Sequence, residues 1–355
     1  MKGLYIHIPF CIKKCIYCDF YSLPYRADLA DQYMQAVARR LEKYPVVFDT
    51  VYFGGGTPSV FGGTRLAELL KNIQICDGAE ITVECNPSTA TATFFETIAV
   101  AGVNRISIGM QSAVPEELCF LTRRHTPAMV QTAVTSAKNA RIDNISVDIM
   151  LGLQGQTIQS LQQTLDFCLH LPITHISAYM LKVEPDTPLA SYDLSGLPDA
   201  DTVAEFYLFL CKYLQQHGFT QYEISNFSKP GYACEHNLLY WNCEPYLGIG
   251  PAAHSFWNGK RMHFPRDLKG FLQGAYPVSD GAGGGIDEYI MLRLRLTEGL
   301  RFDLLKQRGY PPLNQQFLKN CVSLASQGYL ILDNTGVRLT PKGFLVQNQI
   351  LGRLL

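Results

Sequence analysis

The chain has 355 residues, a formal net charge of −1 at pH 7 and a hydrophobic content of 47%. A chain of this length can bury the core of one large α/β domain with a smaller appendage, or of two ordinary domains. Its basic residues are scattered and form no patch or stripe, which argues against a nucleic-acid partner.

The sequence contains no segment that is expected to enter a membrane. Its first residues run directly into a strand-like pattern without the features of a signal peptide, and no apolar stretch reaches the length that spans a bilayer. The most apolar helical run, residues 203–214, is interrupted by Glu205 and Lys212 and is predicted to be a core helix. We therefore expect a cytoplasmic protein with no transmembrane segment.

Six strand-like runs alternate with helix-like segments from the start of the chain. The strand-like runs begin near residues 4, 49, 80, 104, 144 and 174, and the helical patterns cover residues 29–44, 64–73, 91–102, 127–141 and 157–171. This alternation is typical of a parallel sheet with right-handed crossovers, either an open doubly wound sheet or a barrel. No glycine fingerprint of the dinucleotide-binding type follows the first strand.

Polar residues occur at or near the ends of three of these apolar strands. Glu84 ends the third strand, Gln111 ends the fourth, and Asp148 lies inside the fifth. Burying such groups without partners costs roughly 1–3 kcal/mol each, and in β/α barrels the carboxyl ends of the strands carry the active site. We expect the three residues to line a functional site; for Glu84, capping of the following helix is the alternative.

The sequence changes character after about residue 190. Residues 191–202 are predicted to be a linker or crossing loop, and the glycine-rich segment 279–289 is the most flexible by composition. We place a domain boundary near residue 270, which gives domains of residues 1–270 and 271–355. The second contains a helical pattern, two short strands joined by the turn DNTG, and a final helix. This order resembles a winged-helix unit, and without a basic patch its expected role is packing or covering a ligand.

Three of the eleven cysteines, Cys11, Cys15 and Cys18, lie close together directly after the first predicted strand, whereas the other eight are scattered among apolar segments. Thiolates bind zinc or iron–sulfur clusters, usually with four protein ligands at structural sites. Here the position where a nearby fourth cysteine might fall is occupied by Phe20, which cannot bind a metal. A [4Fe-4S] cluster held by three cysteines leaves one iron open to bind a further ligand. A zinc ion completed by His7 or a remote cysteine is the alternative.

The spacing CxxxCxxC, on the loop after the first strand of a β/α-repeat chain, resembles the radical S-adenosylmethionine superfamily. The resemblance implies a partial parallel (β/α)6 barrel of the TIM type. It also implies that the open iron chelates the amino and carboxylate groups of S-adenosylmethionine, and that one electron from the reduced cluster cleaves the sulfonium bond to give a 5′-deoxyadenosyl radical. The loop FGGGTPS, after the second strand, matches the loop that contacts the methionine moiety in this superfamily.

Longer motifs narrow the resemblance to one family. LYIHIPFC, VECNPST, GVNRISIGMQS, HNLLYW and YLGIGPAAHS are similar to the branch that contains oxygen-independent coproporphyrinogen III oxidase and the haem chaperone HemW. The resemblance implies that Cys11, Cys15 and Cys18 hold the cluster. The S-adenosylmethionine site that it implies consists of Tyr5, Gly55, Gly56, Thr57, Glu84, Gln111, Arg123 and Asp148. One departure is Gln154, where the family usually has proline, and it should affect loop stiffness rather than chemistry.

Two functions follow from this branch, and the motifs favour one of them. An oxidase would decarboxylate the propionates of coproporphyrinogen III to vinyl groups, whereas a chaperone would hold haem and deliver it to acceptor proteins. The oxidases carry an N-terminal segment before the cluster, but here Cys11 lies near the start of the sequence. They also have a further cysteine where this chain has Phe20, and HNLLYW is a marker of the chaperone branch.

The HNLLYW motif supplies the predicted haem residues. His236 offers an imidazole to the iron, and Tyr240 and Trp241 could stack on the porphyrin, although all three could equally be hydrogen-bonded or packed structural residues. Cys234 and His254 are other candidate ligands. The partners implied are haem or a porphyrin, haem-acceptor proteins and an electron donor for the cluster. The sequence leaves open whether the chain forms a homodimer.

Overall fold

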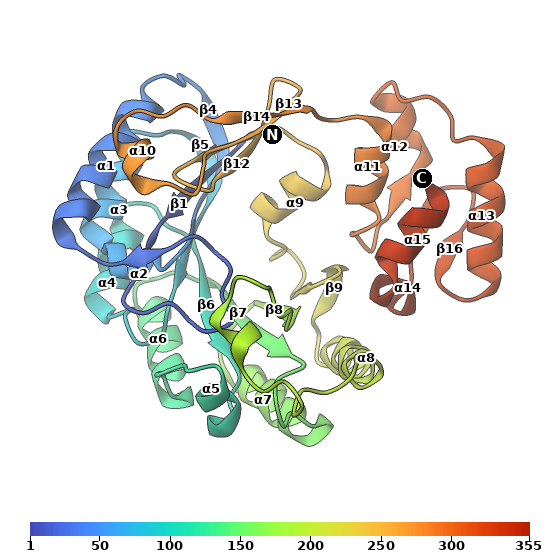
Figure 1. The fold of residues 1–355 in the computed structure, drawn as a ribbon, viewed down its shortest axis with the longest axis horizontal. Coiled ribbons are helices and arrows are strands. Elements are labelled where there is room, and N and C mark those ends of the chain that lie inside the picture. Colours follow the sequence, from blue (N-terminus) through green and yellow to red (C-terminus); the bar gives the residue numbers. More distant parts are fainter.

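In the computed structural model, which describes residues 1–355, most of the chain surrounds one sheet of twelve strands (Figure 1). Its middle consists of six parallel strands that neighbour one another in chain order. These strands are β1 (Gly3–Ile8), β4 (Val47–Gly55), β5 (Gln74–Cys85), β6 (Arg105–Gln111), β7 (Asn144–Leu151) and β8 (His175–Met180). They confirm the six predicted strands.

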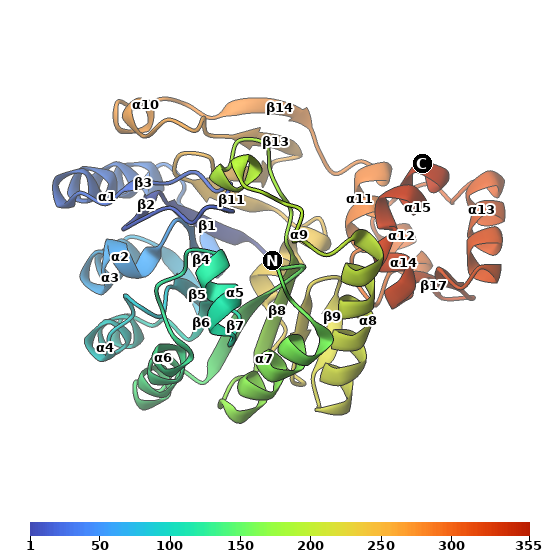
Figure 2. The same ribbon diagram turned by 60° about the horizontal axis from the view of Figure 1, so that its bottom comes forward.

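Helices between these strands cover one face of the sheet (Figure 2). They are α1 (Ala27–Leu41), α2 (Pro58–Phe61), α3 (Gly63–Leu70), α4 (Ala92–Val100), α5 (Pro115–Phe120), α6 (Pro127–Asn139) and α7 (Ile158–His170). The five predicted helices are confirmed, and only the short α2 and α5 were missed. Threonine side chains accept a hydrogen bond from the first turn of α4, α6 and α7, which fixes where these helices begin.

The sheet continues at both edges beyond the predicted strands. Strand β11 (Tyr246–Ile249) pairs in parallel with β1, and the antiparallel strands β12 (His254–Trp257), β13 (Lys260–His263) and β14 (Val278–Ala282) follow it. At the other edge, β10 (Asn226–Ser228) and β9 (Thr220–Glu223) follow β8. The order is linear from β14 to β9, so the sheet is the partial barrel that was predicted.

The remaining elements fall into two groups. One group belongs to the partial barrel, and the other forms a C-terminal unit that lies beside α8 (Figures 1 and 2). Those of the barrel are β2 (Phe10–Cys11), β3 (Leu23–Pro24), the 3-10 helix η1 (Pro188–Ser191), α8 (Ala200–Gln216), α9 (Glu235–Trp241) and α10 (Leu268–Leu272). Those of the unit are α11 (Ile286–Arg293), β15 (Leu300–Arg301), α12 (Phe302–Gln307), α13 (Gln315–Ser326), β16 (Leu330–Leu332), β17 (Gly336–Leu339), α14 (Pro341–Leu345) and α15 (Gln347–Leu354).

The predicted helix, strand pair and final helix of the C-terminal unit are all present. The boundary near residue 270 stays a prediction, but β14 shows that the large sheet extends beyond that residue. The same strand covers part of the segment predicted to be most flexible. None of the helices combines the length and the apolar character needed to cross a membrane.

An aromatic cluster anchors the start of the cysteine loop to the helices. The Phe10 ring stacks parallel to that of Phe61, with ring centroids 6.1 Å apart, and meets Tyr33 edge-on at 5.7 Å. The Tyr33 hydroxyl donates a hydrogen bond of 2.5 Å to the backbone carbonyl of His7. All of these aromatic side chains are buried. The residue before Cys11 therefore has one fixed position, which limits where the loop can begin.

Truncation of this cluster should destabilise the whole fold. We expect Phe61→Ala to lower the free energy of unfolding by about 3–5 kcal/mol, because it leaves a cavity among fully buried rings. Urea unfolding followed by circular dichroism measures the change. Val100→Ala is the control, because that side chain is 92% exposed and should change stability by less than about 0.5 kcal/mol. Equal effects of the two variants would contradict the packing argument.

Candidate functional site

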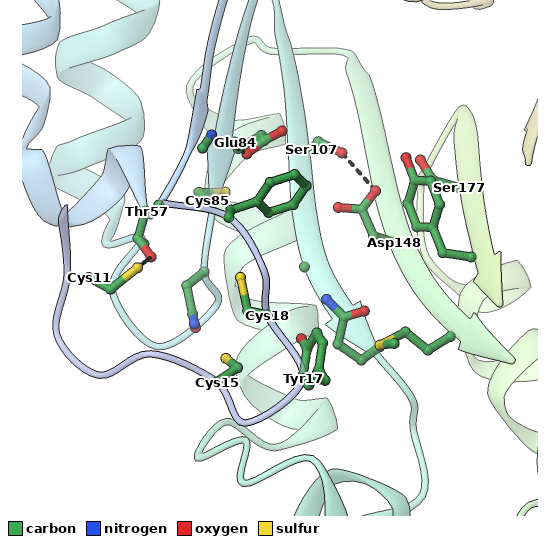
Figure 3. A pocket seen from close by; sticks show the side chains of 18 of the residues that line it. Cys11, Cys15, Tyr17, Cys18, Thr57, Glu84, Cys85, Ser107, Asp148 and Ser177 are labelled. Carbon is green, nitrogen blue, oxygen red and sulfur yellow. Dashed lines mark hydrogen bonds between the residues drawn. The ribbon is translucent and has the colours of Figure 1, made fainter. Parts of the chain in front are cut away.

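A cavity of about 430 Å³ opens where the carboxyl ends of the parallel strands meet the cysteine loop (Figure 3). Parallel strands bring their carboxyl ends to one edge, which is where β/α barrels form their sites. Most of the residues predicted for the cluster and for S-adenosylmethionine line this cavity. They are Cys11, Cys15, Cys18, Gly55, Gly56, Thr57, Glu84, Gln111, Arg123 and Asp148. Tyr5 does not line it and contributes to a second cavity instead.

The three cysteines are free, half-buried thiols on the loop that follows β1 (Figure 3). Cys11 Sγ lies 3.3 Å from the Thr57 hydroxyl, and Arg123 Nη1 donates to Cys15 Sγ at 3.5 Å. The three sulfur atoms do not all lie within 4.8 Å of one another. Three ligands of one zinc ion, each at about 2.3 Å from it, would lie closer than that. The three side chains therefore do not form a preassembled zinc site.

His7, the predicted fourth ligand of the zinc alternative, is engaged elsewhere. Its Nδ1 lies 3.0 Å from the Tyr5 hydroxyl, and its Nε2 lies 2.8 Å from the Tyr21 carbonyl oxygen. The side chain is only 3% exposed and does not line the cavity of the three cysteines. Neither ring nitrogen of His7 is thus free to complete a tetrahedral site with these thiolates.

The glycine loop after β4 lies directly against the cysteine loop. The Gly56 amide donates to the Ile8 carbonyl and the Thr57 amide to the Phe10 carbonyl, both at 2.8 Å. A Cβ atom on Gly56 would lie 2.7 Å from each of these two carbonyl oxygens, closer than Cβ atoms are found. The Gly55 backbone has φ = 105°, which favours glycine. Only glycine at these positions lets the two loops approach, which explains the pattern FGGGTPS.

Two carboxylates face the cavity from β5 and β7, the strands on either side of β6. Glu84 accepts hydrogen bonds from the Tyr52 hydroxyl at 2.8 Å and from the Gly55 amide at 3.2 Å, and Asp148 accepts one from the Ser107 hydroxyl at 2.9 Å. Burial, with the charge of Asp148, raises the pKa of Glu84 to about 7. Burial also raises the pKa of Asp148. Two carboxyl groups in one enclosed site favour a positively charged ligand.

Arg123 and Gln111 sit where β6 departs from regular geometry. Gln111 has φ = 70°, in the left-handed region that non-glycine residues seldom adopt, and the strand register shifts between Gly109 and Gln111. Arg123 donates through Nη2 to the Gly109 carbonyl, while its buried Nε has no partner. The neighbouring Arg124 is exposed. An unpartnered guanidinium nitrogen and a strained backbone are typical of a ligand site.

Sequence reasoning missed several residues that line the same cavity. They are Tyr17, Tyr52, Arg105, Ser107, Ser177, Tyr179, Lys182 and Asn237, with others of the loops. Ser107 and Ser177 carried a usable signal, because each is a polar residue inside an apolar strand, like Asp148. Lys182 and Asn237 follow from no local pattern, since the chain reaches the cavity there through irregular segments and the start of α9.

The histidine of the HNLLYW motif lies in the interior. His236 is 1% exposed, with Nδ1 2.7 Å from the Thr50 hydroxyl and Nε2 2.7 Å from the Tyr240 hydroxyl. Burial, with the positive charge of Arg105, lowers the pKa of His236 to about 3, so the ring is neutral. Its backbone amide donates to Glu80 at 3.0 Å. His236 therefore lines neither cavity and holds α9 in place.

The other predicted haem residues are divided between the interior and a second cavity of about 550 Å³. Tyr240, Tyr5 and His254 line this second cavity. The indole of Trp241 instead packs under the Arg295 guanidinium, 4.4 Å from the ring centroid. Cys234 is fully buried, with its thiol 3.4 Å from a carboxylate oxygen of Glu80. Cys234 thus has no access to either cavity.

Comparison with known proteins agrees with this geometry. Residues 5–168 match the model of the "Radical SAM superfamily", and residues 286–346 match the "HemN C-terminal domain". The solved structure of coproporphyrinogen III oxidase (HemN) from Escherichia coli aligns with a TM-score of 0.85 over 99% of this chain and 89% of that chain, at 22% sequence identity. The match to the superfamily model, together with the partial β/α barrel and its three-cysteine loop, defines a radical S-adenosylmethionine protein.

Curated relatives narrow the assignment from the superfamily to one family. "Heme chaperone HemW" of Haemophilus influenzae is 34% identical over 98% of this chain and 96% of the relative, and that of Escherichia coli is 35% identical over 98% and 97%. The Bacillus subtilis protein is 32% identical over 100% and 99%. The chain belongs to the heme chaperone HemW family. Membership of the radical S-adenosylmethionine superfamily implies a [4Fe-4S] cluster and S-adenosylmethionine.

The raised pKa of Glu84 predicts a pH-dependent cost in stability. A carboxyl group with a reference pKa near 4.5 and a folded value of about 7 opposes folding as the pH rises between these values. In protein without cluster or ligand, Glu84→Gln should therefore be more stable than wild type at pH 8, on the order of 2 kcal/mol, and the gain should shrink toward pH 5. Denaturant unfolding at both pH values measures it.

Glu96→Gln is the matched control, because Glu96 is exposed on α4 and should change stability by less than about 0.5 kcal/mol at either pH. A gain for Glu84→Gln that is the same at pH 5 and pH 8 would contradict the titration argument.

Proposed function

We propose that this protein is a haem chaperone that binds haem and transfers it to acceptor proteins, and that it also holds a [4Fe-4S] cluster and S-adenosylmethionine. The observation that carries the proposal is the similarity to proteins named "Heme chaperone HemW" along nearly the whole length of both chains. Two cavities of suitable chemistry support it: one lined by the three thiols of the cysteine loop together with Glu84 and Asp148, and the other rich in aromatic rings and histidines.

In the first cavity, Cys11, Cys15 and Cys18 would hold the cluster. Their fit rests on three free thiols carried by one loop at the cavity and on Arg123, which already donates to Cys15 and would offset negative charge. Cys85 also lines the cavity, but it is buried at the end of β5 and is not part of the cysteine loop. When bound, the reduced cluster supplies the electron for cleavage of the sulfonium bond.

The remaining lining residues match the charges of S-adenosylmethionine. The carboxylates of Glu84 and Asp148 would attract its positive sulfonium and ammonium groups, and Arg123 has an unpartnered Nε for its carboxylate. Gly55, Gly56 and Thr57 line the cavity with small residues, which leaves room for a ligand beside their backbone. Gln111 lines the same cavity from the carboxyl end of β6.

The cluster proposal predicts a selective dependence on three cysteines. Anaerobically reconstituted wild type should contain about four iron and four acid-labile sulfide per chain. Cys11→Ala, Cys15→Ala and Cys18→Ala should each lose most of both, since two thiolates hold the cluster poorly. Iron and sulfide assays with electron paramagnetic resonance of the reduced protein measure this. Cys119→Ala is the control, because Cys119 is exposed on α5. Purified protein with tetrahedral zinc and no sulfide would refute the proposal.

The HNLLYW motif would serve haem binding indirectly. His236 has both ring nitrogens engaged and supports the Tyr240 hydroxyl, and Tyr240 lines the second cavity. The motif would therefore contribute to haem binding through Tyr240, which forms part of the wall of the second cavity. Trp241 would act at the opposite side of α9, where its stacking with Arg295 fixes the helix. The cytoplasmic location, a homodimer and the electron donor for the cluster stay predictions of the sequence.

Oxidative decarboxylation of coproporphyrinogen III is the second function that the sequence left open. The likeness to the oxidase structure at 22% identity shows the shared fold alone. The sequence feature that speaks against the reaction is Phe20, at the position where the oxidases carry a further cysteine; its side chain is 65% exposed at the rim of both cavities.

Two assays on the same reconstituted protein distinguish the functions. Haemin titration should give a Soret band, and mixing the complex with apomyoglobin should move the haem to that acceptor. With coproporphyrinogen III, S-adenosylmethionine and a strong reductant, the protein should form no protoporphyrinogen. Cys119→Ala should behave like wild type in both assays. Protoporphyrinogen at catalytic turnover, or a protein that binds no haem, would overturn the chaperone proposal.

A further inference from the structure

The second cavity is built on the extension of the sheet rather than on the predicted strands. Strands β11, β12 and β13 place their residues beside β1, and the cysteine loop closes the cavity from the other side. Six aromatic side chains line it, contributed by Tyr5, Phe20, Tyr21, Tyr240, Tyr246 and Phe264. A cavity of about 550 Å³ lies within the roughly 300–1,000 Å³ range of cofactor sites. Its walls suit a flat, largely apolar ligand.

Three histidines line this cavity. Both ring nitrogens of His7 already have hydrogen-bond partners, which leaves the two histidines that face the cavity from neighbouring strands. His254 on β12 and His263 on β13 are directly paired across the ladder, and their rings stack with centroids 5.2 Å apart and an interplanar angle of 28°. Rings that lie side by side cannot bind one metal ion from opposite faces of a porphyrin. Only one of the two imidazoles can therefore be the axial ligand of a haem iron.

Asp280 on β14 distinguishes His263 from His254 as the better candidate for the iron ligand. Its two carboxylate oxygens lie 2.8 and 3.0 Å from His263 Nδ1. A carboxylate only accepts hydrogen bonds, so Nδ1 carries the proton and the neutral ring keeps its lone pair on Nε2. This is the arrangement in which an outer carboxylate orients a metal-binding histidine and makes it a stronger ligand. No such partner is bonded to the ring of His254.

From these contacts we infer that the haem of the proposed function binds in the second cavity, with His263 Nε2 as the iron ligand, His254 packed against it and Asp280 as the positioning carboxylate. The inference rests on the proposed function and adds to it the place where haem binds and the residue that binds its iron. It differs from the motif-based expectation, because His236 has hydroxyl partners on both ring nitrogens and is 1% exposed.

The rim of the cavity fits the polar edge of haem and its release. Arg266 lines the cavity, is exposed, and is bound to Asp19 through two hydrogen bonds of 3.0 and 3.3 Å. A haem propionate can take the place of the Asp19 carboxylate on this guanidinium, because both are planar anions of the same charge. His254 and Asp280 are exposed, so the site lies open to an acceptor. A buried His236 could exchange haem only after α9 had moved.

Haemin titration of single variants tests the inference. His263→Ala should bind haem at least tenfold more weakly than wild type and should lose the Soret position of the imidazole complex, which added imidazole should restore. Asp280→Asn should keep the ligand but lower the iron–imidazole stretching frequency of the ferrous complex in resonance Raman spectra. His170→Ala is the matched control, since this exposed histidine at the end of α7 lines neither cavity.

His236→Ala separates the two candidate ligands. It should weaken binding through loss of support for Tyr240, yet keep the Soret position and the stretching frequency of wild type. If instead His263→Ala keeps the wild-type spectrum and affinity while His236→Ala loses the imidazole signature, the haem site is elsewhere and the inference is wrong, although the chaperone function stands. A tyrosinate-type spectrum that His263→Ala leaves unchanged also overturns it. A wild-type protein that binds no haem refutes the proposed function itself.

Discussion

The approach of two loop backbones is the constraint on which the site depends. Gly56 lies so close to the Ile8 and Phe10 carbonyls that it has no room for a Cβ atom, and its amide and that of Thr57 bond to those same carbonyls. The cysteine loop is thereby attached to the end of β4 one residue before Cys11. Phe10, packed among buried rings, fixes the same point from the other side. The first thiol is thus placed by the backbone and the core together.

Around this fixed point the protein keeps groups that weaken its own fold. Two carboxylates with raised pKa values share one cavity, Gln111 adopts a left-handed backbone, and a buried nitrogen of Arg123 has no partner. Each is unfavourable for folding, and a ligand that carries both charges would compensate the carboxylates and the Arg123 nitrogen. Such local conflict is expected where a site, rather than the core, determines the residue. The large buried cluster of the sheet is what makes this cost tolerable.

The sequence predicted the barrel because its signal is local. Period-two and period-3.6 patterns gave six strands and five helices, and the carboxyl-end rule placed Glu84, Gln111 and Asp148 in one site before any resemblance was considered. The edges of the sheet were missed because β11 to β14 are strands of four or five residues, and the pairing of β11 with β1 joins segments more than 200 residues apart. The exposed β14 leads directly into three consecutive glycines, so this stretch resembles a flexible segment in the local sequence.

The same long-range pairing explains why the HNLLYW motif suggests His236 as the haem ligand, whereas the contacts in the structure favour His263. HNLLYW marks α9, whose histidine serves the interior, whereas His263 and Asp280 carry no local pattern and meet only when β13 and β14 join the sheet. Asp19 and Phe20, directly after Cys18, line both cavities, and Asp19 holds Arg266 at the rim of the second. The salt bridge between Asp19 and Arg266 therefore joins the loop that carries the three cysteines to the rim of the aromatic cavity.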